Sequence, residues 1–182
     1  MMMRKMFLAA SGLSAAFLFA PAAQADITGT VDATITLGAG CIINGQSYDD
    51  GSANVDFGDL SFGVQNTLFT TAEGQVLNGA AGFTVQCSSG VTPAVTFQTG
   101  QNDGSGAGVG LHAMAHQSAA GQFVTYNLYS DAARTAIIPI NGSVSLLANG
   151  APQTVNVYGR AFGEAGLTAG TYTDVLTVVL DL

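Results

Sequence analysis

The sequence predicts an all-β fold: an incomplete immunoglobulin-like β-sandwich, with strand G missing, and an additional strand-like segment at the N-terminus. Three observations support this prediction. Short apolar runs of β type follow one another between glycine and Asn-Gly turn signals, which is typical of a sandwich or a barrel. No segment has the apolar periodicity of an amphipathic helix of three turns. One alternating segment is spare at the start of the chain, whereas a closing strand is missing at its end.

The first 25 residues have the layout of a secretory signal peptide. Arg4 and Lys5 form a basic start, residues 6–20 form an apolar run, and Ala23-Gln24-Ala25 is an A-x-A cleavage site. The apolar run is shorter than the roughly 18 residues that a membrane helix needs. We therefore expect cleavage after Ala25, export of the mature chain and no membrane insertion.

The charge of the mature chain limits its partners. Removal of residues 1–25 leaves 182 − 25 = 157 residues, with 12 carboxylates and two cations, Arg134 and Arg160, so the formal charge is 2 − 12 = −10. A surface that binds phosphate groups needs clustered Lys and Arg. The composition therefore argues against nucleic acid and anionic membrane surfaces as partners. With 48% hydrophobic residues, the chain can nevertheless build a core.

The mature N-terminus, residues 26–37, alternates strictly. Every odd position is apolar or glycine, and every even position is Thr or Asp. This period of two predicts a β-strand with one apolar face. Twelve residues is long for a strand, and it stands at a terminus, where chains usually fray.

Six further strands are predicted along the rest of the chain, at 83–87, 94–99, 111–117, 123–129, 154–161 and 172–182. Asn-Gly pairs occur between such runs, and both residues tolerate the positive φ of a type I′ turn. These pairs are Asn44-Gly45, Asn78-Gly79, Asn141-Gly142 and Asn149-Gly150.

The two mature cysteines, Cys41 and Cys87, predict a disulfide, because an exported protein meets an oxidising compartment. In the chain-entropy model a bridge over 46 positions is worth about 4 kcal/mol. Its Cα atoms should lie about 4.4–6.8 Å apart. Two unpaired buried thiols are the alternative; a metal site lacks a second cysteine pair or nearby histidines.

The last predicted strand opens with Gly170-Thr171-Tyr172, which resembles the tyrosine corner of immunoglobulin-like sandwiches. In such a sandwich strand G follows strand F, but this sequence ends with F. An uncovered groove beside F would expose unpaired amides and a stripe of core. The simplest solution is that the spare N-terminal strand of one molecule fills the groove of another.

Five stretches form a recognisable combination in this order: Ile27-Thr28-Gly29-Thr30-Val31-Asp32 with Cys41 after it; Phe57-Gly58-Asp59-Leu60; Phe83-Thr84-Val85-Gln86-Cys87; Tyr126-Asn127-Leu128-Tyr129-Ser130-Asp131-Ala132-Ala133-Arg134-Thr135; and Gly170-Thr171-Tyr172-Thr173-Asp174-Val175-Leu176-Thr177-Val178. The combination resembles subunits of the archaic, Csu-type chaperone–usher pili, which form the spore coat protein U domain family. The resemblance covers the whole mature chain.

In that family each subunit lacks strand G, and a periplasmic chaperone lends it a strand. At the outer-membrane usher, the N-terminal segment of the next subunit replaces the chaperone strand by adding to the sheet edge. The resemblance implies a pilus at the cell surface that serves adhesion and biofilm formation, with the chaperone, the usher and other pilin subunits as partners in a homo- or hetero-polymer. It also assigns donor-strand residues, which are Ile27, Gly29, Val31, Ala33 and Ile35.

The same resemblance assigns Leu176, Val178 and Leu180 to one wall of the acceptor groove. The chain then divides into a signal peptide (1–25), a donor strand (26–37) and a pilin domain (38–182).

No motif for catalysis, a cofactor or a metal is recognisable. His112 and His116 lie four residues apart in a predicted strand, about 13 Å, so they cannot share an ion, and we expect them on the surface. The alternating glycines of residues 104–110 match no nucleotide-binding pattern and favour a flexible hairpin tip. No serine lies in a G-x-S-x-G elbow. We therefore expect a protein that is not an enzyme and needs no cofactor.

Three alternatives compete with the pilin hypothesis. The first is a self-complemented secreted or spore-coat structural protein, whose N-terminal strand fills its own groove. The second is a small outer-membrane β-barrel, although such barrels have aromatic girdles and this chain has no Trp and ends in Leu182. The third is a secreted enzyme or carbohydrate-binding module, for which the sequence offers no site.

Overall fold

The computed structural model describes residues 26–182, so the predicted signal peptide lies outside the described residues. Contacts divide the chain into a part that ends at Ile35 and a compact part, Thr36–Leu182. In residues 26–35 the backbone belongs to no strand, and the side chains of Ile27, Val31 and Ile35 are 100%, 95% and 81% exposed. An extended segment is a strand only when a ladder partner satisfies its amides.

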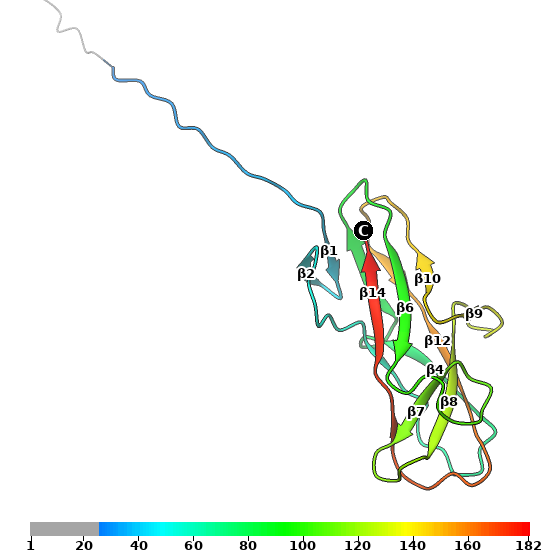
Figure 1. The fold of residues 1–182 in the computed structure, drawn as a ribbon. Coiled ribbons are helices and arrows are strands. Elements are labelled where there is room, and N and C mark those ends of the chain that lie inside the picture. Colours follow the sequence, from blue (N-terminus) through cyan, green and yellow to red (C-terminus); the bar gives the residue numbers. More distant parts are fainter. Residues whose placement is uncertain (1–25) are drawn as a thin grey trace, which may run out of the picture. The chain divides into compact units, whose positions relative to one another are not determined.

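The described residues contain fourteen β-strands and no helix (Figure 1). The strands are β1 (Gly40–Ile43), β2 (Gln46–Asp49), β3 (Asp59–Leu60), β4 (Thr71–Leu77), β5 (Phe83–Cys87), β6 (Ala94–Gly100), β7 (His112–His116), β8 (Phe123–Tyr129), β9 (Ile137–Ile138), β10 (Gly142–Ser145), β11 (Gln153–Val155), β12 (Tyr158–Phe162), β13 (Tyr172–Thr173) and β14 (Leu176–Asp181).

The strands form three antiparallel sheets. One has the order β11-β5-β1-β2, a second has the order β10-β6-β14, and the largest has the order β13-β7-β8-β12-β4-β3 with β9 attached to β8. Consecutive strands such as β6 and β7, or β13 and β14, belong to different sheets. The chain therefore bends from one sheet into another at these points, as strands do at the corners of a sandwich.

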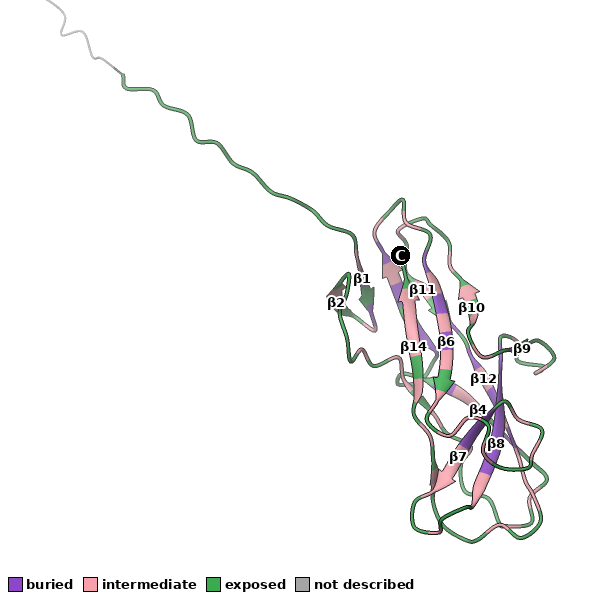
Figure 2. Cartoon of the chain, in the orientation of Figure 1, coloured by how far each residue is buried: buried purple, intermediate pink, exposed green. Residues whose placement is uncertain are grey.

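The core lies where the three sheets meet. Phe83 and Val85 of the first sheet, Val95 and Phe97 of the second and Leu128 of the third belong to one apolar cluster, and each is at most 2% exposed. Burial of each large side chain stabilises the fold by about 1.5–3 kcal/mol. Figure 2 shows β8 almost wholly buried, whereas β14 is mostly of intermediate burial.

The predicted all-β sandwich is confirmed, and several predicted strands agree closely with the structure. Residues 83–87 and 123–129 are β5 and β8 as predicted. Two predicted strands are each broken in two. Residues 154–161 become β11, which pairs with β5, and β12, which pairs with β4 and β8. Residues 172–182 become β13, paired with β7, and β14, paired with β6. Alternation continues through such a bend, so the pattern does not reveal it.

The Asn-Gly turns follow the prediction at one position of four. Asn44 (φ 51°) and Gly45 (φ 81°) both have positive φ and join β1 to β2, as a type I′ turn requires. At the other three pairs only one residue has positive φ, namely Gly79, Asn141 and Gly150. The prediction of type I′ turns is wrong there. At the second pair, for example, Asn78 pairs with Ala81 across the two-residue loop Gly79-Ala80, so Asn78 lies outside the two central positions of the turn.

Candidate functional site

β14 has a free edge on its outer side. It is the last strand of the order β10-β6-β14, and within the described residues its only ladder partner is β6. The amides and carbonyls of its other side therefore lack partners in a ladder, which is the arrangement that invites another strand. The apolar side chains of Leu176, Val178 and Leu180 pack against the core cluster but remain only half-buried.

A groove of about 630 Å³ runs along this free edge. Residues 175–182 line one bank, and they include all three predicted wall residues, Leu176, Val178 and Leu180. The other bank comes from β1, β2 and the loop that follows; its larger apolar members are Cys41, Ile43, Tyr48, Val55 and Phe57. The groove is therefore an opening into the core between two sheet edges.

Sequence analysis did not identify the far bank of the groove. Its loop, residues 50–57, has no apolar periodicity, so the sequence pattern did not indicate that these residues line a groove. Phe57 is held by an edge-to-face contact with the buried Phe83, with ring centroids 5.3 Å apart. Phe57 opens the stretch Phe57-Gly58-Asp59-Leu60 that carries the family resemblance, and this was the one available signal.

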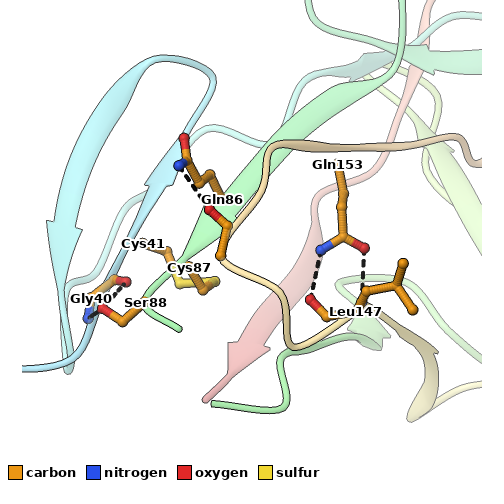
Figure 3. Close-up of a disulfide and its surroundings, with 8 residues drawn as sticks. Gly40, Cys41, Gln86, Cys87, Ser88, Leu147 and Gln153 are labelled. Atoms are coloured by element: carbon orange, nitrogen blue, oxygen red, sulfur yellow. Dashed lines mark hydrogen bonds between the residues drawn. A yellow bond between two sulfur atoms is a disulfide. The ribbon is translucent and has the colours of Figure 1, made fainter. Parts of the chain in front are cut away.

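The predicted disulfide is present and ties the far bank to the core. Cys41 of β1 and Cys87 of β5 are bonded and lie directly opposite each other in the β1–β5 ladder (Figure 3). Their Cα atoms are 4.0 Å apart, below the predicted lower limit. The neighbouring Ser88 N–H donates to the Gly40 carbonyl at 3.0 Å, which makes the cysteines a non-hydrogen-bonded pair. Such pairs approach more closely than hydrogen-bonded ones.

A second groove, of about 780 Å³, opens beside β13. It is lined by residues 60–67 after β3, by residues 167–172 before and within β13, and by inward-facing side chains such as Met114 and Val124. β3 and β13 are the two edges of the largest sheet, so this opening is the gap that the sheet leaves between its edges. On one bank, residues 167–172 line this second groove and residues 175–182 line the first.

Tyr172 is fixed at the start of β13. Its hydroxyl donates a hydrogen bond to the carbonyl of Thr168, four residues upstream, at 2.8 Å. Its ring packs edge-to-face against the ring of His116, with the ring centroids 4.9 Å apart. A tyrosine that bonds back to the backbone a few residues upstream is the arrangement of a tyrosine corner. The bond holds the entry of the last strand against β7.

The expectation of surface histidines is wrong for His112. Its side chain is 1% exposed, and its Nδ1 donates to the Asp103 carboxylate at 3.0 Å. His116 is half-buried, and its Nδ1 accepts from the N–H of Ser118 at 2.9 Å. Alternation along the strand could not show that a loop carboxylate nine residues earlier folds over His112. Among residues 26–182, no three His, Cys, Asp or Glu side chains gather as a metal site would require.

The glycine-rich loop between β6 and β7 is packed rather than free at its tip. A Cβ at Gly108 or Gly110 would collide with Thr125 or Tyr126 of β8, and one at Gly106 would lie 3.1 Å from Phe123 and Thr125. The N–H of Leu111 also donates to the Asn127 side chain at 2.7 Å. The prediction of a flexible tip is therefore wrong for residues 106–110, because these glycines allow the loop to lie close against β8.

Both mature cations are engaged by one carboxylate. Arg134 and Arg160 form ion pairs with Glu73 at 3.1 and 3.0 Å. Arg134 also donates to the carbonyls of Gly159 and Gly74 at 3.0 and 3.1 Å. The two arginines thus support the β4–β12 region of the domain.

No helix in residues 26–182 is long and apolar enough to cross a membrane. No curated protein matches the chain. Among solved structures, it is similar to the pre-assembly complex of CsuC and CsuE, a chaperone and a tip adhesion subunit of archaic chaperone–usher Csu pili from Acinetobacter baumannii. The identity is 17% and the TM-score is 0.44; the match covers 81% of this chain and 41% of that chain.

The family model of the Spore Coat Protein U domain matches residues 27–179. This range includes residues 27–37 of the alternating segment, the disulfide, the second groove, and the first groove and β14 as far as Val179. The chain therefore belongs to the Spore Coat Protein U domain family.

Proposed function

We propose that this protein is a structural pilin subunit of a chaperone–usher pilus and that it polymerises by donor-strand exchange. One observation carries the proposal: the free edge of β14 borders a groove that opens into the core. The chain also contains an alternating segment whose apolar side chains are exposed. The free edge of β14 in one molecule and the unpaired segment 26–37 of a second molecule could therefore form a β-ladder with each other.

Length supports the pairing of these two features. Residues 26–37 would span about 40 Å when extended. The line from Thr171 to Leu182 also contains twelve residues, and it borders both grooves. A donor strand from residues 26–37 could therefore run beside β13 and β14 and cover both openings.

Burial of the donor side chains supplies the driving force. Ile27, Val31 and Ile35 are at least 81% exposed in the lone chain. Their insertion would contribute about 5–9 kcal/mol before ordering costs, at about 1.5–3 kcal/mol for each large side chain. Gly29 and Ala33 would occupy the shallower positions between them. Ladder hydrogen bonds to β14 add to this, so the joint is durable without a covalent link.

The partners follow from the same mechanism. A periplasmic chaperone would cover the groove before assembly, an outer-membrane usher would be the site of exchange, and other pilin subunits would be the neighbours in the fibre. In this proposal the signal peptide (1–25) directs export, residues 26–37 are the donor strand and residues 38–182 form the pilin domain. The fibre at the cell surface would serve adhesion and biofilm formation. The protein would act as a structural element rather than as an enzyme.

Deletion of residues 26–37, with the signal peptide retained, tests the proposal. The shortened subunit should bind the chaperone but form no fibres, because its groove is intact while its donor is gone. Without the chaperone it should aggregate or be degraded, because the edge of β14 is uncovered. Pull-down with the chaperone and size-exclusion chromatography of periplasmic extract measure the two effects. A stable, soluble monomer of the shortened chain would contradict the missing strand and favour a self-contained domain.

Assembled fibres should survive molar salt. The mature chain carries a formal charge of −10, and in residues 26–182 both cations already pair with Glu73, so contacts between subunits have few ion pairs to rely on. At molar ionic strength, charges are screened within about 3 Å, whereas apolar insertion persists. Sedimentation of fibres in 0.1 and 1 M sodium chloride (about tenfold apart in ionic strength) measures this. Release of subunits at the higher concentration would count against donor-strand insertion.

A further inference from the structure

We propose that Asp174 is a positioning residue that sets the register of β14 and so fixes which of its side chains face the groove. Asp174 acts together with Tyr126 and with residues 100–102, and we name this set the Asp174 clamp. The inference rests on the proposed function, because it concerns how the acceptor wall is presented to a donor strand.

Asp174 lies at the break between β13 and β14, where the chain passes from the largest sheet to the three-stranded sheet. Its Oδ2 accepts a hydrogen bond from the Tyr126 hydroxyl at 2.9 Å. Its Oδ1 accepts from the N–H of Gln101 at 3.0 Å and from the side-chain amide of Asn102 at 3.2 Å. One carboxylate thus joins the start of β14 to β8 and to the loop that follows β6.

The clamp is closely packed. Gly100 pairs with Leu176, the first residue of β14, and a Cβ at Gly100 would collide with the carboxylates of Asp174 and Asp103. Asp103 is held in turn by the Gly100 N–H at 2.8 Å and by Nδ1 of the buried His112 at 3.0 Å. Each carboxylate oxygen in this network has a donor, whereas Nε2 of His112 is buried without a partner among the described residues. The hydrogen bonds hold both carboxylates in a low-dielectric setting, where such bonds are strong.

Tyr126 is suited to the role of a permanent donor. Its side chain is 4% exposed, and its ring lies 5.2 Å from that of His112. Burial, followed by the negative charge of Asp174 and the hydrogen bond to it, raises the pKa of the Tyr126 hydroxyl far above its usual value. The hydroxyl therefore stays protonated at neutral pH, where it donates to Asp174.

β14 needs such a fixed point because its ladder with β6 is irregular. Leu176 pairs with Gly100 and Val178 pairs with Phe97, so two steps along β14 correspond to three along β6. Side chains alternate with a period of two, and a slip by one residue would turn Leu176, Val178 and Leu180 away from the groove. The other edge of β14 is free and cannot correct the slip. The clamp, two residues before Leu176, holds the correct register.

Paired cysteines in assembled fibres test this inference. Both residues border the groove, but Thr177 is exposed, whereas Val178 is half-buried and packs against the core cluster. Cysteine is placed at Thr177 or at Val178, and in the same chain at Thr30, Asp32 or Thr34 on the polar face of residues 26–37. Oxidised dimers are then measured on non-reducing gels. With the clamp intact, Thr177→Cys should link to one dominant donor position, and Val178→Cys should link to none of the three.

Loss of the clamp should reverse which of the two β14 cysteines forms disulfide-linked dimers with the donor positions. In Asp174→Ala and Gly100→Ala backgrounds, the Thr177→Cys dimer should be largely lost and Val178→Cys dimers should appear. Tyr126→Phe keeps the ring and removes one bond, so it tests the clamp where a harsher change lowers the yield of folded subunit. Asp131→Ala is the matched control, because its carboxylate likewise binds loop N–H groups, at Thr135 and Ala136, but in the β8–β9 loop.

The outcomes separate the inference from the function on which it rests. An unchanged Thr177→Cys pattern in Tyr126→Phe and Gly100→Ala fibres would overturn the role of Asp174 in setting the register. Equal loss of the pattern in Asp131→Ala would also overturn it, since any destabilised subunit would then behave alike. Absence of dimers from Thr177→Cys to every donor position in the otherwise unchanged chain would overturn donor-strand exchange itself.

Discussion

Val31→Asp should abolish surface fibres while leaving export and chaperone binding intact. Val31 is central among the apolar positions of residues 26–37 and is 95% exposed in the lone chain. Insertion into the neighbouring groove would bury its side chain. The substitution would force a carboxylate into an apolar pocket, where an unpaired charge is strongly unfavourable, and would also lose about 1.5–3 kcal/mol of apolar burial. Electron microscopy of cells and immunoblots of sheared fibres measure the loss.

Two substitutions on the opposite face serve as matched controls. Thr30→Asp adds the same charge one position earlier, and Asp32→Asn changes a charge one position later. Both positions should lie on the solvated side of the inserted strand, so both variants should retain fibres. The groove of the Val31→Asp subunit is unchanged, so it should still accept the chaperone strand. If Val31→Asp and Asp32→Asn gave equal amounts of fibre, or if Val31→Asp lost chaperone binding first, residues 26–37 would not be the donor strand.

Removal of the disulfide should produce the second large effect. Replacement of Cys41 and Cys87 by Ala should lower the stability of the domain by about 4 kcal/mol on the chain-entropy model. Small domains are stable by only about 5–15 kcal/mol, so much of the variant should be degraded before assembly. Cys41 also lines the groove, and its bond to Cys87 holds β1 in place as the far bank. The loss should therefore reduce both the abundance of the subunit and its capture by the chaperone.

The measurement is the level of subunit in periplasmic extract, together with the urea midpoint of the purified chaperone complex. Thr84→Ala is a suitable control, because Thr84 is exposed on β5 between the buried Phe83 and Val85. Substitutions of this kind usually change stability by less than about 0.5 kcal/mol. Treatment of the natural chain with a reducing agent should reproduce the double variant. An unchanged midpoint in the double variant would show that the bridge contributes nothing to the folded state.

The sequence was most informative where structure is local. The buried faces of β5 and β8 could be predicted because alternation reports directly on a strand with one side in a core. The disulfide followed from two cysteines and an export signal. The bends at Asn156-Val157 and Asp174-Val175 could not be predicted, because a change of sheet leaves the alternation of side chains intact.

The groove was predicted only on one bank. Leu176, Val178 and Leu180 were assigned to the groove wall by the family resemblance, whereas Tyr48, Val55 and Phe57 come from a hairpin and an irregular loop without a period. The burial of His112 was not predicted for a similar reason. Its partner Asp103 lies in a loop whose path is set by close packing against β8. Contacts between distant segments are decided by tertiary packing, which a single sequence does not display.

The pairing of Arg134 and Arg160 with Glu73 has a consequence for proteolysis. Trypsin-like proteases cut after Lys or Arg, and the mature chain has no Lys and only these two Arg residues. Arg134 is held by carbonyls and an ion pair, and Arg160 lies within β12, between β4 and β8. Neither peptide bond can enter a protease cleft without local unfolding. The absence of Lys also leaves amine-directed reagents no side chain to attack. In the proposed fibre, both properties would limit damage by proteases and by amine-reactive compounds.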